Sequence, residues 1–394
     1  MTRLLIYLFP AIIDMVIGTV LFIGCVRVAE SGGSATAVAS VLITSFATYI
    51  LTCLVLGRVV TPRNAPGIVI GAAALTVINA GAFVLFGDLQ IMYLWIVVQA
   101  LAAACFFVPF QIFMKTVDQS HPAGISRSIA LYTFSWSAGL CLGPFVSGYI
   151  WEYFGWQWCH GLNALLAATA MVGIILLRHH ANPQTSFQPA PDPNLHQPFD
   201  YSRMPDFAWL GWLCAGIGCL AFYMIFSLFP STAKFYAIPK ATQGTVIALV
   251  SGAQALTGLS LIRSRIWMYL VKPVFVFGLA GIVSLLLFGC STRAWLFCLA
   301  AVCFGIYSGS FFFYFVFHSL VHPSRSSRYV SINETIVGIC GIVGPLSGGL
   351  IADNFGVGAP YYFAAVLVTM AVCFKALVHY KHAARIRSVI QPNR

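Results

Sequence analysis

One stretch of this chain occurs twice, 201 residues apart. Residues 127–155 read RSIALYTFSWSAGLCLGPFVSGYIWEYFG, and residues 328–356 read RYVSINETIVGICGIVGPLSGGLIADNFG. When residues 121–155 are aligned without a gap on the later copy, ten of 35 positions are identical, several times the random expectation. A repeat of this length predicts two halves of common design, running in the same order and direction, rather than a short-period solenoid.

The apolar residues of the chain gather in twelve runs. Hydrophobic residues make up 60% of the sequence and charged residues only 8%, whereas a soluble domain averages roughly 25% charged residues. Each run has about the 20 residues that cross a bilayer as a helix. We therefore predict an all-α polytopic membrane protein, built as two six-helix bundles. The runs are 4–28, 35–57, 66–87, 90–114, 127–150, 157–177, 207–230, 241–262, 272–290, 294–320, 329–352 and 359–380.

A polar segment separates the sixth run from the seventh. Its proline, glutamine, aspartate and asparagine residues bury too little apolar area to fold alone, which is typical of a flexible tether. The predicted organisation is an N-terminal bundle at 1–178, a cytoplasmic linker at 179–206, a C-terminal bundle at 207–380 and a cytoplasmic tail at 381–394.

The basic residues sort by loop. Sixteen lysines and arginines fall on the side that holds both termini, and four fall on the other side. Cytoplasmic loops carry such an excess, so we expect both termini in the cytoplasm. The net charge of +11 then reflects topology and contact with lipid headgroups, not nucleic-acid binding. The expected location is the inner (plasma) membrane of a bacterium.

Both copies of the repeat place closely spaced glycines beside a proline. Small residues let helix backbones approach each other in lipid, and a proline within a helix bends it. The predicted helix-packing residues are Gly139, Gly143, Pro144 and Gly148 in the first copy and Gly344, Pro345, Gly348 and Gly349 in the second.

The first copy resembles the fifth-helix motif G-x-x-x-G-P-x-x-G-G of the major facilitator superfamily. The second copy resembles the corresponding eleventh-helix motif of that family. The resemblance implies two pseudo-symmetric bundles that rock to alternate access, with a small-molecule substrate and no cofactor. Because the sequence has no phosphate loop, nucleophile elbow or zinc signature, we expect a secondary transporter driven by an ion or solute gradient. We also expect the protein to be a monomer. We expect neither an enzyme nor a metal site.

Two acidic residues lie inside predicted spans, Asp14 and Glu334. A charge at the centre of a bilayer costs about 2.5–3.5 kcal/mol on insertion scales, so such residues normally face water or a partner. Asp14 is a candidate for substrate binding and for proton coupling, and Glu334 is a candidate for proton coupling. The alternative is a structural acid that is hydrogen-bonded to neighbouring helices.

The tenth predicted span carries an aromatic face, because its aromatic residues follow spacings of 4, 3 and 4. Tyr307, Phe311 and Tyr314 match phenylalanines of the fourth span, and His318 follows as a further proton-coupling candidate. In the resembling family these two helices line the central cavity. Ordinary packing and lipid contact remain the alternatives. The predicted substrate contacts are Asp14, Gln99, Phe106, Phe110, Tyr307, Phe311 and Tyr314.

Two departures from the family pattern leave the direction of transport open. The loop after Gly57 has Thr61 and Pro62 where the family has an aspartate and an arginine. Ile96 stands where proton-coupled drug exporters have an arginine. Uptake and multidrug efflux both stay open, and so do symport, antiport and facilitated diffusion. A receptor or scaffold built on a transporter frame is the alternative from another functional class.

Overall fold

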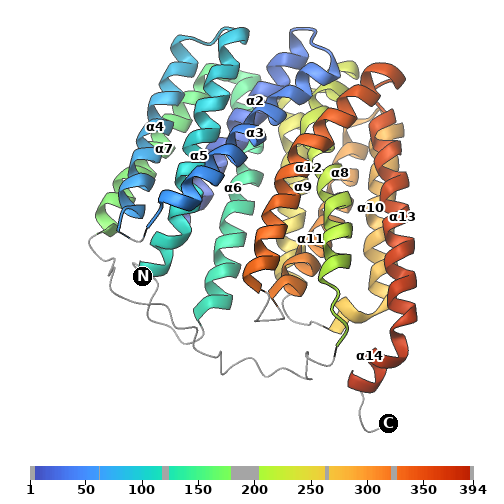
Figure 1. The fold of residues 1–394 in the computed structure, drawn as a ribbon. Helices are drawn as coiled ribbons and strands as arrows, with labels where there is room; N and C mark the ends of the chain where they lie inside the picture. Colours follow the sequence, from blue (N-terminus) through green and yellow to red (C-terminus); the bar gives the residue numbers. More distant parts are fainter. Residues whose placement is uncertain are drawn as a thin grey trace. The chain divides into compact units, whose positions relative to one another are not determined.

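The computed structural model describes residues 5–61, 63–117, 124–178, 204–261, 266–320 and 326–390. Helices account for nearly all of these residues, and no strand occurs within them (Figure 1). Eleven helices in the described ranges are long and apolar enough to cross a membrane. α6, which covers the predicted run 127–150, is a further helix of 31 residues. The prediction of an all-α polytopic membrane protein is confirmed.

The helices follow the predicted runs closely. In the first half of the chain they are α2 (Leu8–Glu30), α3 (Ala35–Val59), α4 (Ala65–Leu85), α5 (Leu89–Val117), α6 (Gly124–Phe154) and α7 (Trp156–Leu177). In the second half they are α8 (Ala208–Phe235), α9 (Lys240–Leu261), the short 3-10 helix η3 (Ile266–Tyr269), α10 (Val271–Cys290), α11 (Ala294–Leu320), α12 (Ser326–Phe355), α13 (Ala359–Lys381) and α14 (Ala383–Ile390).

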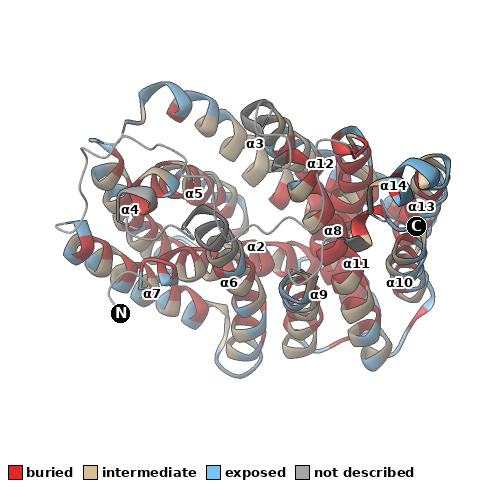
Figure 2. Ribbon diagram, turned by 90° about the horizontal axis from the view of Figure 1, so that it is seen from below, coloured by how far each residue is buried: buried red, intermediate tan, exposed pale blue. Residues whose placement is uncertain are grey.

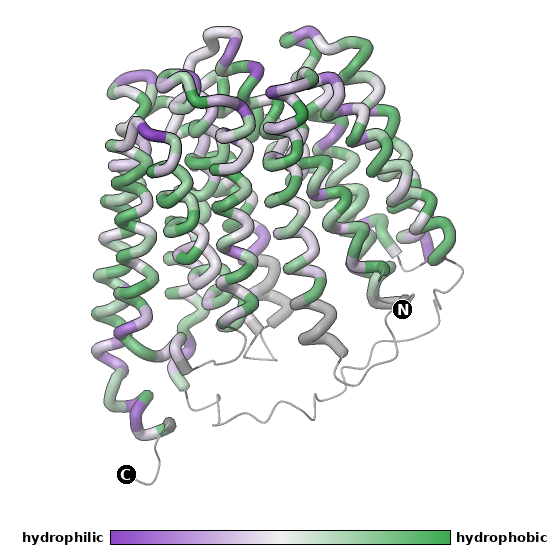
Figure 3. Tube along the Cα trace, turned by 180° about the vertical axis from the view of Figure 1, so that it is seen from behind, coloured by the Kyte–Doolittle hydropathy of each residue, from purple (hydrophilic) through white to green (hydrophobic). Residues whose placement is uncertain are grey.

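Hydropathy follows these elements along the chain. Apolar residues colour most of the length of the long helices, and hydrophilic residues gather mainly toward their ends (Figure 3). Seen from below, the buried residues concentrate on the helix faces that meet other helices (Figure 2). This distribution is the one expected of helices that bury backbone polar groups internally and present apolar side chains to lipid.

The chain divides into two compact units. Unit 1 consists of Met1–Gly32, Ser40–Leu195 and Pro239–Ala248, and unit 2 of Gly33–Ala39, His196–Ile238 and Leu249–Arg394. Each unit therefore includes a short segment from the opposite half of the sequence. The domain limits inferred from the sequence stay a prediction, and most of the linker 179–206 lies outside the described residues.

In unit 1, the glycines of the first motif hold α6 against α2. A Cβ at Gly143 would lie 2.5 Å from the Met15 carbonyl oxygen and 3.0 Å from the Thr19 nitrogen. A Cβ at Gly139 would meet the Ala11 carbonyl. The Thr19 hydroxyl donates a hydrogen bond of 3.2 Å to the carbonyl of Gly143. The two backbones are in contact, so only glycine fits at these positions.

Unit 2 repeats this contact between its own first and fifth helices. A Cβ at Gly344 of α12 would lie 2.7 Å from the Leu220 carbonyl oxygen of α8. At Gly348 it would lie 2.7 Å from the Leu228 side chain. Pro144 and Pro345 lie within α6 and α12 beside these contacts. The duplicated motif thus marks a duplicated packing of the first helix of each half on the fifth.

The acidic residue near the end of each motif caps the start of another helix. In unit 1, Glu152 Oε2 accepts a hydrogen bond of 2.7 Å from the Lys240 amide at the start of α9. In unit 2, Asp353 accepts bonds of 2.7 Å and 3.0 Å from the Ala35 and Thr36 amides at the start of α3. A carboxylate satisfies free amides there and complements the positive end of the helix dipole.

The last glycine of each motif lies next to the capped helix. A Cβ at Gly148 would be 2.7 Å from the Lys240 carbonyl and 3.1 Å from the Gly244 Cα. A Cβ at Gly349 would be 2.8 Å from the Thr36 Cα. Each copy of the motif therefore contacts two helices, one through its Gly-Pro pair and one through its last glycine and acid.

Candidate functional site

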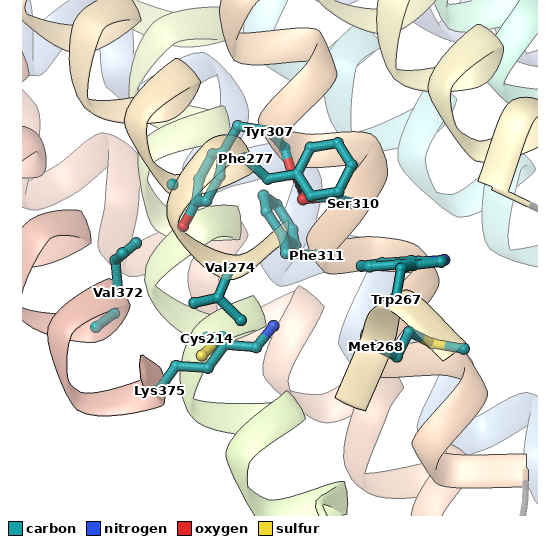
Figure 4. Close-up of a pocket in the computed structure, with 12 residues that line it drawn as sticks. Cys214, Trp267, Met268, Val274, Phe277, Tyr307, Ser310, Phe311, Val372 and Lys375 are labelled. Atoms are coloured by element: carbon teal, nitrogen blue, oxygen red, sulfur yellow. Dashed lines mark hydrogen bonds between the residues drawn. The ribbon is translucent and has the colours of Figure 1, made fainter. Parts of the chain in front are cut away.

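A cavity lies inside unit 2, where η3, α8, α10, α11 and α13 meet (Figure 4). Its walls include the rings of Trp267, Phe277, Tyr307 and Phe311. It offers about 30 Å³ for the centres of water molecules. Since one water needs roughly 10–15 Å³ by this measure, the cavity has room for about two waters or one small polar group.

Glycines on neighbouring helices allow two of these rings into the cavity wall. Gly281 of α10 faces Tyr307, where a Cβ would lie 2.6 Å from the ring. Gly218 of α8 faces the ring of Phe311 in the same way. The Tyr307 and Phe311 ring centroids are 5.2 Å apart at an angle of 62°. Both rings lie on the face of α11 that the sequence singled out, and both are buried.

Among the described residues that line the cavity, Lys375 of α13 carries the only formal charge. The lysine lies on the face of α13 that also holds the buried Ala371 and His379. Its ammonium nitrogen is 3.4 Å from the centroid of the Tyr314 ring. Among the described residues it makes no hydrogen bond or ion pair.

The contacts of Lys375 in unit 2 do not balance the cost of placing its charge in a membrane span. A lysine within a membrane span costs about 2.5–3.5 kcal/mol, and a desolvated cation–π contact returns about 2 kcal/mol. The interactions in the described part of unit 2 thus leave part of the cost uncompensated. Lys375 lies within the last predicted run, 359–380, and is not among the candidates named from the sequence. One sequence pattern could have identified Lys375: it stands four residues before His379, on the face of α13 that carries small residues.

An aromatic and histidine cluster lies next to the lysine. The Tyr314 hydroxyl and His379 Nε2 are within hydrogen-bond distance, at 3.3 Å. The His318 ring lies 4.3 Å from the Tyr314 ring and 5.8 Å from the Phe207 ring. Tyr314, His318 and His379 are almost completely buried. The structure therefore places Tyr307 and Phe311 in the cavity wall and Tyr314 and His318 in the cluster beside Lys375, and a role for His318 in proton coupling stays a prediction.

In unit 1, Asp14 is buried on the face of α2 that meets α6. A Cβ at Gly139 would lie 2.8 Å from the Asp14 Cβ, so the carboxylate sits beside the Gly-Pro motif. In the part of the chain that the structure describes, it has no hydrogen-bond or ion-pair partner. Among the described residues, no hydrogen bond from a neighbouring helix supports the alternative that Asp14 is a structural acid.

Gln99 is tied to the neighbouring helix α4. Its Oε1 accepts a hydrogen bond of 3.0 Å from Asn79 Nδ2, and Asn79 also donates to the Trp95 carbonyl at 3.2 Å. The Gln99 Nε2 and the Asn79 Oδ1 make no further hydrogen bond. This amide pair joins α4 to α5, and a substrate contact by Gln99 stays a prediction.

Phe106 and Phe110 lie within an apolar cluster of unit 1. Their rings are stacked with centroids 5.0 Å apart, and Tyr132 stacks on Phe110 at 6.5 Å. The cluster also includes residues of α2, α4 and α7, and both phenylalanines are at most 1% exposed. Such apolar surroundings are what ordinary packing, the alternative to substrate contact, predicts for these two rings. Substrate contact by Phe106 and Phe110 stays a prediction.

Glu334 has an exposed side chain on α12. Its neighbour Asn333 is buried and accepts hydrogen bonds of 2.9 Å from both Trp212 Nε1 and the Ser319 hydroxyl. Glu334 itself makes no hydrogen bond or ion pair with any described residue. Because an unpaired charge in lipid is costly, this side chain requires contact with water.

No three His, Cys, Asp or Glu side chains converge as a metal site within the described ranges. The titratable groups above are therefore isolated carboxylates in α2 and α12 and a lysine–tyrosine–histidine cluster in unit 2. Such groups can bind a charged solute or carry a proton.

Comparison with known proteins identifies the class of the molecule. The sequence model of the Major Facilitator Superfamily matches residues 4–317. The human MFS-type transporter SLC18B1 is 27% identical over 130 residues, which are 28% of this chain and 28% of that relative. The match thus spans little more than a quarter of the relative's length.

Solved structures agree with this chain in fold. A bacterial homologue of the human lysosomal transporter Spinster matches with a TM-score of 0.69 and 14% identity, over 98% of this chain and 97% of that one. The nucleoside transporter NupG matches with a TM-score of 0.67 and 14% identity, over 96% and 99% of the two chains.

Proposed function

Because the chain belongs to the Major Facilitator Superfamily, we propose that it is a secondary active transporter of a small organic solute. It is a multi-pass membrane protein of a transporter family. In this proposal the protein works by rocker-switch alternating access, with protons as the coupling ion. It acts as a monomer in a bacterial inner membrane, with both termini in the cytoplasm.

The observation that carries the proposal is the buried Asp14 carboxylate of α2. It lies within an apolar span and has no hydrogen-bond or ion-pair partner in the described chain. A proton or a cationic solute group would neutralise it, which is the usual role of an acid at this depth. Its position beside Gly139 means that a change of charge there would act on the α2–α6 contact.

The other candidate residues divide by role in this proposal. Glu334, on the exposed face of α12, is a second proton carrier together with His318. Gln99 is a polar contact to the solute. The ring contacts to the solute are Phe106, Phe110, Tyr307, Phe311 and Tyr314.

Transport in proteoliposomes tests the proposal. The purified protein is reconstituted, a pH gradient is imposed, and flux is measured for sugars, nucleosides, organic acids and amphipathic cations. We expect gradient-dependent flux of at least one class, absent from empty liposomes and reduced in Asp14→Asn. An absence of such flux across the whole panel would contradict the proposal and favour a receptor or scaffold on a transporter frame.

Leucine substitutions separate ring contact with the solute from packing. Phe311→Leu keeps most of the side-chain volume but removes a ring at the cavity. We expect solute binding to weaken by about 2- to 10-fold, because a ring contact contributes about 0.5–1.5 kcal/mol, with the protein yield unchanged. Binding is measured by titration calorimetry with the solute that the flux panel identifies.

Phe110→Leu is the matched comparison in unit 1. If Phe110 contacts the solute, binding weakens as in Phe311→Leu. If Phe110 only packs, the melting temperature of the Phe110→Leu variant falls while solute binding persists. A loss of yield and of binding in equal measure for Phe311→Leu would assign that ring to packing as well.

A further inference from the structure

We infer that the cavity inside unit 2 binds the anionic group of a small organic monocarboxylate, with the Lys375 ammonium as its counter-ion. This inference rests on the proposed function, because it names the substrate class. It adds a residue that has no place among the sequence-derived candidates.

Geometry directs the lysine into the cavity. In Figure 4 the Lys375 side chain runs past Cys214 toward the space between α10 and η3, with its nitrogen at the inner end. The Tyr314 ring covers the ammonium on one side. A side chain that reached outward to lipid headgroups would leave this space to apolar atoms. The inward position gives the cavity a positive charge.

The charge of the cavity is not balanced by its lining. No aspartate or glutamate is among the residues that line it. The polar groups near the lysine include the Cys214 thiol, the Tyr314 phenol and the Ser310 hydroxyl, none of which is an anion in its ordinary state at neutral pH. The partner that completes the site must therefore bring the negative charge with it.

Size and wall chemistry narrow the anion. The cavity offers about 30 Å³ for water centres, which is room for about two waters. One carboxylate group occupies about this space. Trp267, Phe277 and Phe311 offer apolar surface for the rest of the ligand. A phosphate would carry up to two charges against one lysine, and no arginine is among the described residues that line the cavity, so none of them offers bidentate recognition. A short-chain monocarboxylate, of about the size of acetate, matches the charge, the volume and the walls.

Ligand pairs that differ only in charge test the inference. Acetate is compared with acetamide, and formate with formamide, on the full-length protein in nonionic detergent. We expect the carboxylates to raise the melting temperature and to bind in calorimetry, and the amides to do neither. In Lys375→Met, which keeps the side-chain length, carboxylate affinity should fall at least tenfold.

Two variants control this measurement. Lys381→Met removes an exposed lysine at the end of the same helix and should bind carboxylates like the unmodified protein. Lys375→Arg keeps the charge and should retain part of the affinity. Size-exclusion chromatography checks that each variant is folded. Should Lys375→Met fail that check, the difference between each carboxylate and its amide in the unmodified protein still decides whether the site recognises charge.

Several results would overturn the inference. Equal effects of acetate and acetamide would mean that charge is not recognised. Equal affinity in Lys375→Met would exclude this lysine. Chloride or inorganic phosphate that binds as well as the carboxylates would assign the site to an inorganic ion. Since binding is measured without transport, carboxylate binding without flux would refute only the proposed function, and flux of neutral solutes alone would refute only this inference.

Discussion

Replacing Gly143 by alanine is expected to reduce severely the yield of folded protein. The new Cβ would lie 2.5 Å from the Met15 carbonyl oxygen and 3.0 Å from the Thr19 nitrogen. Both are backbone atoms, so neither can move aside by a change of rotamer. Overpacking of this kind costs about 1–3 kcal/mol or more, and it would separate α2 from α6. Yield and melting temperature in detergent measure the effect.

The repeat supplies a second variant and the chain supplies a control. Gly344→Ala should disrupt the contact between α8 and α12 in the same way, because the new Cβ would lie 2.7 Å from the Leu220 carbonyl oxygen. Gly161 of α7 has no atom within 4 Å of a built Cβ. Gly161→Ala should therefore leave stability unchanged or raise it by about 1 kcal/mol through helix propensity. A normal melting temperature in Gly143→Ala would contradict the close packing.

In a second prediction, Glu334→Gln abolishes solute accumulation and leaves exchange intact. One charge moved across 100 mV is worth about 2.3 kcal/mol, which supports roughly 50-fold accumulation. If Glu334 carries the coupling proton, glutamine should reduce that ratio to about one, because it cannot take up and release a proton. Exchange of labelled for unlabelled solute needs no net proton movement and should continue.

Measurements of accumulation and exchange in the same proteoliposomes distinguish coupling from folding. Glu334→Asp keeps a carboxylate and should retain accumulation. Loss of both activities in Glu334→Gln would indicate a folding or binding defect. Unchanged pH-driven accumulation in this variant would remove Glu334 from the coupling mechanism and leave Asp14 as the remaining carboxylate candidate.

The aromatic candidates show where sequence spacing stops being informative. Phe106 and Phe110 share their helical register with Tyr307 and Phe311 across the repeat. The first pair lies in an apolar cluster, whereas the second lines a cavity. Spacing identifies residues on one face of a helix, but it does not say whether side chains of other helices fill the space in front of that face.

The amide and the lysine extend the same lesson. Gln99 was predicted to contact the substrate, yet its hydrogen bond goes to Asn79 on α4. Lys375 follows no motif, yet its ammonium lies over Tyr314. Polar groups in a membrane find partners through tertiary contacts, so a single helix pattern cannot name those partners.

The sequence by itself determined the number of apolar runs, the duplication and the family, because lipid restricts a spanning chain to helices of a set length. The Gly-Pro repeat also marked the close contacts before their partners were known. Only the tertiary structure decided which helices meet at Gly143 and Gly344, which start of a helix each acid caps, and where the charged side chains lie. These depend on contacts between residues far apart in sequence, and no periodicity within one helix encodes them.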